Sequence, residues 1–391
     1  MRVLIVTNLF PNSREPGRGV FNRQQVAELA RGHRVTVIAP VPWVPLGFGR
    51  LAAGRRFASV PRRETIDGLE VWHPRYLAIP GIGRPLHGVG YFLGIRRTVN
   101  AIHRRTPIDV VLATWAYPDV FGAVLAARRI GRPVVAKVHG SDIHLALRLG
   151  WRRRAIRWAL SHCAAVIAVS ESLKQALLAL GLEAQRIVVV PNGVDRARFA
   201  PMERHAAREA LRLRPQGRRI VFVGHLTAVK GLQTLIDAML QVPGDVRLTL
   251  VGEGELAEPL RASAASRGLN GRVEFVGRRP HEEIPLWLNA ADVCCLPSLS
   301  EGCPNAAVEA LACGRPVIAS RVGGVPDVVR EPACGILVPA GQPQALAQAL
   351  TAALARPWDA GTIRASIEAW GWAENVERLE AVLQAAAAGA A

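Results

Sequence analysis

The chain has little lysine and lacks the aspartate spacing that holds a metal–diphosphate complex. Its only lysines are Lys137, Lys174 and Lys230, so arginine carries most of the positive charge. No two aspartates are spaced i, i+2, and a D-x-D motif is therefore absent. If the protein binds a diphosphate, we expect its own cations and backbone N–H groups to neutralise the charge. We predict no metal site and no divalent cation.

The cysteines and the apolar stretches exclude further classes. The six cysteines form neither C-x-x-C pairs nor Cys/His metal spacings, which favours buried thiols in a reducing compartment. The most apolar long window, 76–95, contains five Gly, two Pro, Arg84 and His87, a composition unsuited to a membrane-spanning helix. A strand-like run begins at Arg2 and leaves no room for a signal peptide, so we expect a cytoplasmic protein.

The positive charge lies in one half of the chain. Residues 1–195 carry 28 Lys and Arg against 11 Asp and Glu, whereas the remainder carries 21 against 20, within a net charge of +18. Such a half predicts an anionic partner, and without nucleic-acid motifs an anionic inner membrane surface fits better than nucleic acid. A basic segment flanked by tryptophans is one candidate for this contact, although a solvated helix face has the same pattern. Its residues are Arg152, Arg153, Arg154, Arg157 and Trp158.

Short apolar runs alternate with helical patterns, which is typical of α/β proteins with parallel sheets. The predicted strands are 2–7, 33–39, 109–114, 133–138, 164–169, 186–190, 219–224, 246–252, 272–276, 292–296, 316–319 and 335–338. A chain of 391 residues suits two domains, and turn residues at 191–195 suggest the boundary. We predict domains at 1–195 and 196–365, then a helix and flexible tail at 366–391. The Pro- and Gly-rich region 41–95 reads as an irregular insertion.

The segment 297–314 contains two carboxylates separated by seven residues. Glu301 lies in a loop after an apolar strand, and Glu309 is expected two turns into the next helix. The N-terminus of that helix offers unpaired N–H groups and a positive dipole end, which suit a phosphate. Carboxylates beside a phosphate site can accept hydrogen bonds from sugar and ribose hydroxyls. Two solvated acids would be the ordinary alternative.

Other candidates follow strands. Lys230 opens a helix, where a cation is unfavourable unless it meets an anion, and it follows the strand that ends at Gly224 and His225. Gly19 precedes a helix after the first strand and allows a phosphate to approach, or it is an ordinary turn glycine. His139 ends another strand, where ligands of α/β sheets bind. Asp142 could orient His139 or cap the helix that follows, and we expect the cap.

The segment Gly252–Ala257 matches the G-x-G-x-x-A dinucleotide fingerprint, with Glu274 about twenty residues further on. However, it follows the second strand of its domain instead of the first. A dehydrogenase would also leave the paired glutamates unexplained. We therefore take it as the weaker interpretation.

Taken in order, these segments resemble the retaining glycosyltransferases of family 4, also called glycosyl transferases group 1. The resemblance runs through 16–20, 137–142, 190–195, 223–225, 230–231 and the E-x7-E segment 297–314. It implies the GT-B architecture, in which two Rossmann-like domains face each other across a cleft and a C-terminal helix crosses back to the first domain. The segments 6–12 and 39–45 are similar to those of polysaccharide transferases of the teichuronic-acid type.

The resemblance also implies roles for individual residues. Glu309 would hold the ribose, Glu301 the sugar hydroxyls, and His139 the donor sugar. The departing diphosphate would contact Lys230, His225, Gly19, Gly224 and the backbone of Gly302, Cys303, Pro304 and Asn305. Glu253, Val276 and Gly277 would line the nucleotide pocket. The family commonly has Arg where this chain has His225, which lowers the positive charge expected there.

The expected function is therefore transfer of a sugar from a UDP- or GDP-linked donor to a lipid-linked or glycan acceptor, at the inner face of the membrane. Two alternatives stay open. One is a nucleotide-sugar 2-epimerase of the same architecture. The other is a non-catalytic membrane- or nucleic-acid-binding protein.

Overall fold

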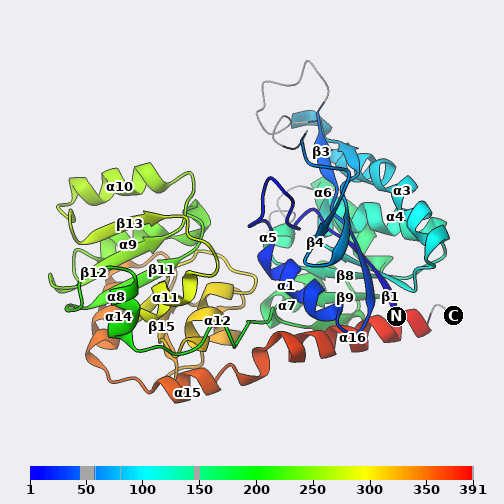
Figure 1. Ribbon diagram of the computed structural model, residues 1–391. Helices are drawn as coiled ribbons and strands as arrows, with labels where there is room; N and C mark the ends of the chain where they lie inside the picture. The colour runs from blue at the N-terminus through cyan, green and yellow to red at the C-terminus, as the bar shows by residue number, and fades with distance from the viewer. Residues whose placement is uncertain (45–56, 58, 80, 145–149, 390–391) are drawn as a thin grey trace. The chain divides into compact units, whose positions relative to one another are not determined.

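A computed structural model describes residues 1–44, 57, 59–79, 81–144 and 150–389. The chain forms two compact units, each α/β (Figure 1). The first unit comprises Met1–Gly193 together with Trp372–Ala391, and the second comprises Val194–Gly371. The first unit is therefore built from two separate stretches of the sequence.

The first unit contains an eight-stranded sheet in the order β10-β9-β8-β7-β1-β2-β5-β4, parallel except where β4 pairs antiparallel with β5. Its strands are β1 (Arg2–Val6), β2 (Arg34–Ile38), β4 (Arg63–Ile66), β5 (Leu69–Trp72), β7 (Val110–Thr114), β8 (Val134–Val138), β9 (Ala165–Ala168) and β10 (Ile187–Val189). Strands β7 and β8 are buried along their whole length, as expected for a parallel sheet covered on both faces. The strand order reverses between β1 and β7.

Helices complete the first unit. They are α1 (Val20–Leu29), α3 (His87–Arg105), α4 (Phe121–Arg129), α5 (Ser141–His144), α6 (Gly150–Ser161), α7 (Glu171–Ala179) and the C-terminal α16 (Trp372–Ala388). Helix α16 contacts α1, β7 and β8 (Figure 1). Its fully buried Leu379 and Leu383 share one core with Val3 and Ile5 of β1. Polar contacts reinforce this docking, because Lys137 donates to Gln25 and Gln25 donates to Asn375.

The described part of region 41–95 is more regular than the composition suggested, and residues 45–56, 58 and 80 lie outside the described residues. It contains β4 and β5, a small parallel sheet of β3 (Val41–Trp43) and β6 (Arg75–Leu77), and the start of α3. Two of the glycines explain the discrepancy. A Cβ at Gly90 would lie 2.6 Å from the carbonyl oxygen of Leu77, and one at Gly94 would lie 2.6 Å from that of Arg75. These glycines let α3 pack closely against β6.

The second unit contains a six-stranded parallel sheet in the order β13-β12-β11-β14-β15-β16. Its strands are β11 (Arg219–Val223), β12 (Arg247–Val251), β13 (Val273–Gly277), β14 (Val293–Leu296), β15 (Val317–Ser320) and β16 (Gly335–Val338). Its helices are α8 (Arg204–Ala210), α9 (Leu232–Ala238), α10 (Ala257–Ser266), α11 (Ile284–Asn289), α12 (Asn305–Ala312), α13 (Val325–Val328), α14 (Pro343–Ala355) and α15 (Ala360–Ala365). The strand order reverses between β11 and β14, and ligands of open α/β sheets bind at such a point.

Every strand predicted from the sequence is present, with ends that agree to within one residue. The predicted α/β class is confirmed. So is the return of the C-terminal helix to the first unit.

Candidate active site

The second unit brings Lys230 and Glu301 together at the switch point of its sheet. Lys230 follows β11 and Glu301 follows β14, and the Lys230 Nζ lies 2.6 Å from Oε1 of Glu301. The Ser298 hydroxyl donates to the same oxygen at 2.6 Å. Glu301 is almost buried, whereas Lys230 is partly exposed. No described residue hydrogen-bonds the other carboxylate oxygen, Oε2, and this oxygen remains able to accept from a ligand hydroxyl.

Close backbone packing fixes both residues. Gly231 has φ +61°, and a Cβ there would lie 2.1 Å from the carbonyl oxygen of Pro297. Leu299 N–H also donates to the Val229 carbonyl at 2.8 Å. On the other side, a Cβ at Gly323 would lie 1.8 Å from the carbonyl oxygen of Glu301. The loops carrying the cation and the carboxylate are thus locked together by main-chain contacts.

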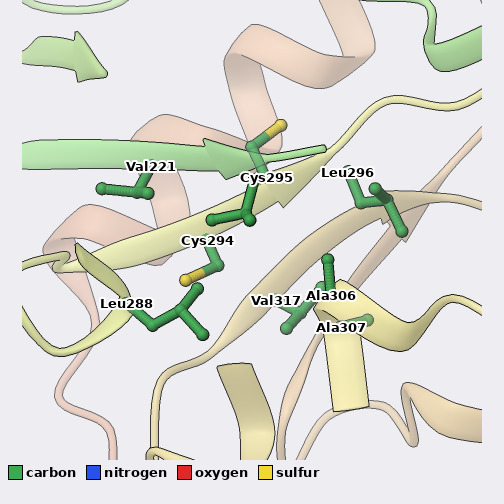
Figure 2. A pocket seen from close by; sticks show the side chains of 9 residues that line it. Val221, Leu288, Cys294, Cys295, Leu296, Ala306, Ala307 and Val317 are labelled. Carbon is green, nitrogen blue, oxygen red and sulfur yellow. The ribbon is translucent and has the colours of Figure 1, made fainter. Parts of the chain in front are cut away.

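Helix α12 begins at Asn305, next to Glu301, and its N-cap residue Pro304 makes no side-chain capping bond. The positive end of the helix dipole favours an anion at this loop. Two N–H groups here also bond within the turn, because Asn305 donates to the Cys303 carbonyl at 3.0 Å and Ala307 to that of Pro304 at 2.9 Å. Small side chains bring this end close to the sheet. Ala306 and Ala307 line a narrow apolar cavity against Cys294, Cys295 and their neighbours (Figure 2). Gly302, Cys303 and Pro304 form the loop before the helix, as predicted.

Glu309 lies just over one turn into α12, not two, because the helix starts at Asn305. Its Oε1 lies 3.1 Å from Nε2 of His281, in the loop before α11. Arg198 donates to Nδ1 of the same ring at 3.3 Å, and Phe199 packs against the ring edge-on at 5.3 Å. Because arginine can only donate, Nδ1 is the acceptor and Nε2–H donates to Glu309. His281 belongs to no sequence motif and was not predicted, because its partners come from separate segments of the second unit.

The remaining predicted donor residues lie at the carboxyl ends of β11, β12 and β13. His225 is exposed, and no described side chain hydrogen-bonds its ring. Glu253 is half-exposed and pairs with Arg278 at 3.2 Å. Gly277 ends β13, and its carbonyl accepts from the Gly252 N–H at 2.9 Å. Val276 is partly buried beside it.

The dinucleotide-like segment has a structural explanation. A Cβ at Gly252 would lie 1.9 Å from the carbonyl oxygen of Gly224, and one at Gly254 would lie 2.3 Å from that of Leu226. The two glycines therefore allow the loop that carries His225 to pack closely against this segment. Glu274 lies within β13, not at its end, and pairs with Arg219 at 2.7 Å. Its carboxylate is thus paired with Arg219 of β11 on an open face of the sheet.

In the first unit, Gly19 is the N-cap of α1 with φ +61°. A Cβ there would lie 2.2 Å from the carbonyl oxygen of Leu9, so the turn itself requires glycine. Contrary to the prediction, Asp142 does not cap α5. Its Oδ1 accepts from the N–H groups of His139 and Gly140, and its Oδ2 accepts from that of Ala116. Asp142 therefore fixes the loop of His139.

His139 lies at the carboxyl end of β8, with its ring 5.0 Å from that of Phe21. Its Nε2 is buried, and no described residue hydrogen-bonds it. Burial, helped by the positive charge of Lys137, holds the pKa of His139 well below its usual range. The ring is therefore neutral and presents an unsatisfied nitrogen.

The basic helix α6 differs from the expected membrane anchor. Trp158 packs between Phe121 and His162 at 4.9 and 4.6 Å, and the guanidinium of Arg128 lies 5.4 Å from its ring. Arg152 lies over the ring of Tyr117. Both side chains are thus engaged within the first unit, and only Arg153, Arg154 and Arg157 are exposed. No helix in the described ranges is long and apolar enough to cross a membrane.

Two α/β units with parallel sheets, one of them with a cation and a carboxylate at its switch point, fit a glycosyltransferase with two Rossmann-like domains. Residues 20–198 match the model of Glycosyltransferase Family 4, and residues 217–356 match that of Glycosyl transferases group 1. The chain is 30% identical over 362 residues to TuaC of Bacillus subtilis, a glycosyltransferase named for teichuronic acid biosynthesis, covering 90% of this chain and 88% of that protein. The protein therefore belongs to glycosyltransferase family 4.

Further comparisons agree. AmsK of Erwinia amylovora, named as an amylovoran biosynthesis glycosyltransferase, is 31% identical over 253 residues, or 62% of this chain and 60% of that protein. The crystal structure of Anabaena HepE with UDP has a TM-score of 0.76 at 21% identity, covering 98% of this chain and all of that one. Sucrose-phosphate synthase of Thermosynechococcus elongatus has a TM-score of 0.76 at 22% identity, covering 99% and 96%. These structures share the GT-B fold.

Proposed function

We propose that the protein is a retaining glycosyltransferase that moves a sugar from a nucleoside-diphosphate sugar to a hydroxyl of a lipid-linked or polysaccharide glycan. The observation that carries this proposal is the contact of Lys230 with Glu301, in the loop that leads into the N-terminus of α12. Crystals of HepE with UDP and with UDP-glucose support a nucleotide-sugar donor. Relatives named for teichuronic acid and amylovoran support a cell-envelope or exopolysaccharide glycan. We propose that the reaction takes place at the inner membrane face.

Each donor group would meet a matching protein group. The diphosphate lies at the α12 N-terminus, where Lys230, His225 and the backbone of 302–305 balance its charge. Glu301 accepts hydrogen bonds from sugar hydroxyls through Oε2, and Glu309 accepts from the ribose. Lys230 then lies between the carboxylate and the phosphate, so its contact with Glu301 aims the ammonium group.

In the reaction, the bond between the anomeric carbon and the diphosphate oxygen breaks while the acceptor oxygen bonds to the same face of that carbon. The acceptor proton passes to a phosphate oxygen of the leaving nucleotide. Negative charge grows on the diphosphate as the bond breaks, so Lys230 and the helix dipole stabilise the transition state more than the ground state. We expect this to proceed without a divalent cation.

A nucleotide-sugar 2-epimerase would use the same donor contacts but would need no acceptor. The two activities are separated by adding a membrane fraction or glycan acceptor to purified protein with radiolabelled donor. Label in the acceptor supports the transferase. Label only in free sugar or in an altered nucleotide sugar supports the epimerase.

The first test is calorimetric titration with UDP, GDP, ADP, CMP and NAD, with a chelator present. We expect one nucleoside diphosphate to bind, and Glu309→Ala to weaken it. Binding of NAD alone would return Gly252–Ala257 to consideration and overturn the proposal. A strict requirement for a metal ion would overturn the part of the proposal that concerns a mechanism without a divalent cation.

Turnover tests the role of Lys230. Lys230→Ala should lower kcat by about 10²–10³-fold, the usual cost of removing one charge-stabilising group. Lys174→Ala is the matched control, because Lys174 makes only a 3.9 Å surface contact with Glu171. Unchanged turnover in Lys230→Ala would favour a non-catalytic protein.

A further inference from the structure

One face of α3 is exposed to solvent along its whole length. Leu86, just before the helix, begins a series spaced by three or four residues, which places its members on one stripe. The stripe consists of Leu86, Val89, Leu93, Arg97, Ala101 and Arg104, all exposed. The side chain of Leu86 is 63% exposed, that of Leu93 is 49% exposed and that of Val89 is 42% exposed. The stripe is therefore apolar towards its N-terminal end and basic towards its C-terminal end.

The apolar part continues onto the small sheet of β3 and β6. Leu77 of β6 lies against α3 at Gly90, and Trp43 of β3 is its neighbour across the sheet. Both side chains are exposed. We call Trp43, Leu77, Leu86, Val89 and Leu93 the α3 patch. It holds five of the ten large hydrophobic side chains that are exposed among the described residues, which indicates a contact surface.

The surroundings of the α3 patch are cationic. Between Glu70 and Asp109 the sequence has no acidic residue and six arginines. Arg97 and Arg104 form no ion pair with any residue that the structure describes. Helix α3 packs on α4, and α4 packs on α6, whose exposed Arg153, Arg154 and Arg157 extend the charge.

We propose that the α3 patch docks the first unit on the surface of an anionic lipid bilayer. Apolar side chains beside a row of arginines match the boundary between acyl chains and anionic headgroups, where interfacial helices lie. Nucleic acid would satisfy the arginines but would leave the five apolar side chains in water. The inference replaces α6 as the docking element, since the Trp158 ring packs within the unit. The inference rests on the proposed function in one respect: a lipid-linked acceptor would give the enzyme a reason to dock on a bilayer.

The test is co-sedimentation of the full chain with vesicles of phosphatidylcholine alone, or with about 30 mol% phosphatidylglycerol, near physiological salt. We expect binding to the anionic vesicles, and a loss of at least about 10-fold in the partition coefficient for Leu86→Ser/Leu93→Ser. Arg97→Gln/Arg104→Gln should lose binding to the anionic vesicles as well. Leu240→Ser is the matched control, because Leu240 is 52% exposed in the second unit.

Several outcomes would overturn the inference. Equal vesicle binding by wild type and Leu86→Ser/Leu93→Ser would do so, as would loss only in Arg153→Gln/Arg154→Gln/Arg157→Gln. A wild-type dimer that this leucine variant converts to a monomer, with no vesicle binding, would assign the patch to a second copy. Titration with UDP, GDP and ADP keeps the two proposals separate: vesicle binding without binding of any of these nucleotides would sustain this inference and defeat the transferase.

Discussion

At the scale of single residues, His281 is the clearest addition to the site. If Glu309 holds the ribose, then His281 is a positioning residue that holds its carboxylate through Oε1 and leaves Oε2 to the ligand. His281→Ala should weaken UDP binding by about 10-fold, as loss of such supporting contacts commonly does. Calorimetry would measure the loss. His281→Gln, which keeps a donor, should restore part of it.

A nucleotide without ribose hydroxyls distinguishes positioning from general damage. With 2′,3′-dideoxy-UDP, the difference between wild type and His281→Ala should largely disappear, because Glu309 then has nothing to hold. If the variant weakens both nucleotides equally, His281 acts on the fold instead. If Glu309→Ala binds UDP normally, the assigned role of Glu309 is itself wrong.

His139 predicts a pH effect on stability. Its pKa is well below the usual value when the protein is folded, whereas the unfolded chain titrates near about 6.5. Below that pH the unfolded state binds a proton that the folded state does not. The free energy of unfolding should therefore fall as pH drops from about 6.5 towards the lower folded pKa. His139→Gln should reduce this fall, as measured by denaturant unfolding at pH 7.5 and 5.5.

Exposed His205 supplies the control for that measurement. His205→Gln should leave the pH dependence close to that of wild type. The same acid sensitivity in wild type and His139→Gln would show that the ring becomes protonated in the folded protein.

At the scale of elements, the turn before α9 depends on Gly231. Gly231→Ala would combine a left-handed backbone with a Cβ only 2.1 Å from the Pro297 carbonyl oxygen. Gly268→Ala is a matched control, with φ +71° and open space around its Cβ. The control should cost about 1–2 kcal/mol from the backbone conformation alone. Gly231→Ala should cost roughly 2 kcal/mol more in the unfolding of the second unit, and equal costs would contradict the close approach.

An element can be predicted from the sequence when a local pattern of residues determines it, and is missed when contacts with distant residues determine it. The buried strands were predicted well, because parallel strands covered on both faces are continuous apolar runs such as Val110–Thr114. The small sheet and the start of α3 were missed, because Gly90 and Gly94 act through close packing that a sequence pattern does not reveal. Similarly, Glu301 and Lys230 were found from their loops. His281 was not, since it belongs to no motif and its contact with Glu309 forms only in the folded second unit.

At the scale of the whole molecule, the chain leaves the first unit at Gly193 and returns to it at Trp372. Helix α16 supplies core residues to strands formed from the opposite end of the sequence. The first unit therefore cannot complete its core until the chain has passed through the second. Whether the two units unfold together or separately can be tested by weakening the core of one unit at a time.

Leu379 of α16 and Leu350 of α14 are both fully buried, one in the core of each unit. Leu379→Ala and Leu350→Ala should each destabilise their own unit by about 2–5 kcal/mol, the range for leucine deletions in packed cores. Hydrogen exchange in denaturant, followed on peptides from β1 and β11, separates the two. Leu379→Ala should speed exchange in β1 and spare β11, and Leu350→Ala should do the reverse. If either variant accelerates both strands equally, the units unfold as one cooperative body, because a defect in one core is then transmitted to the other.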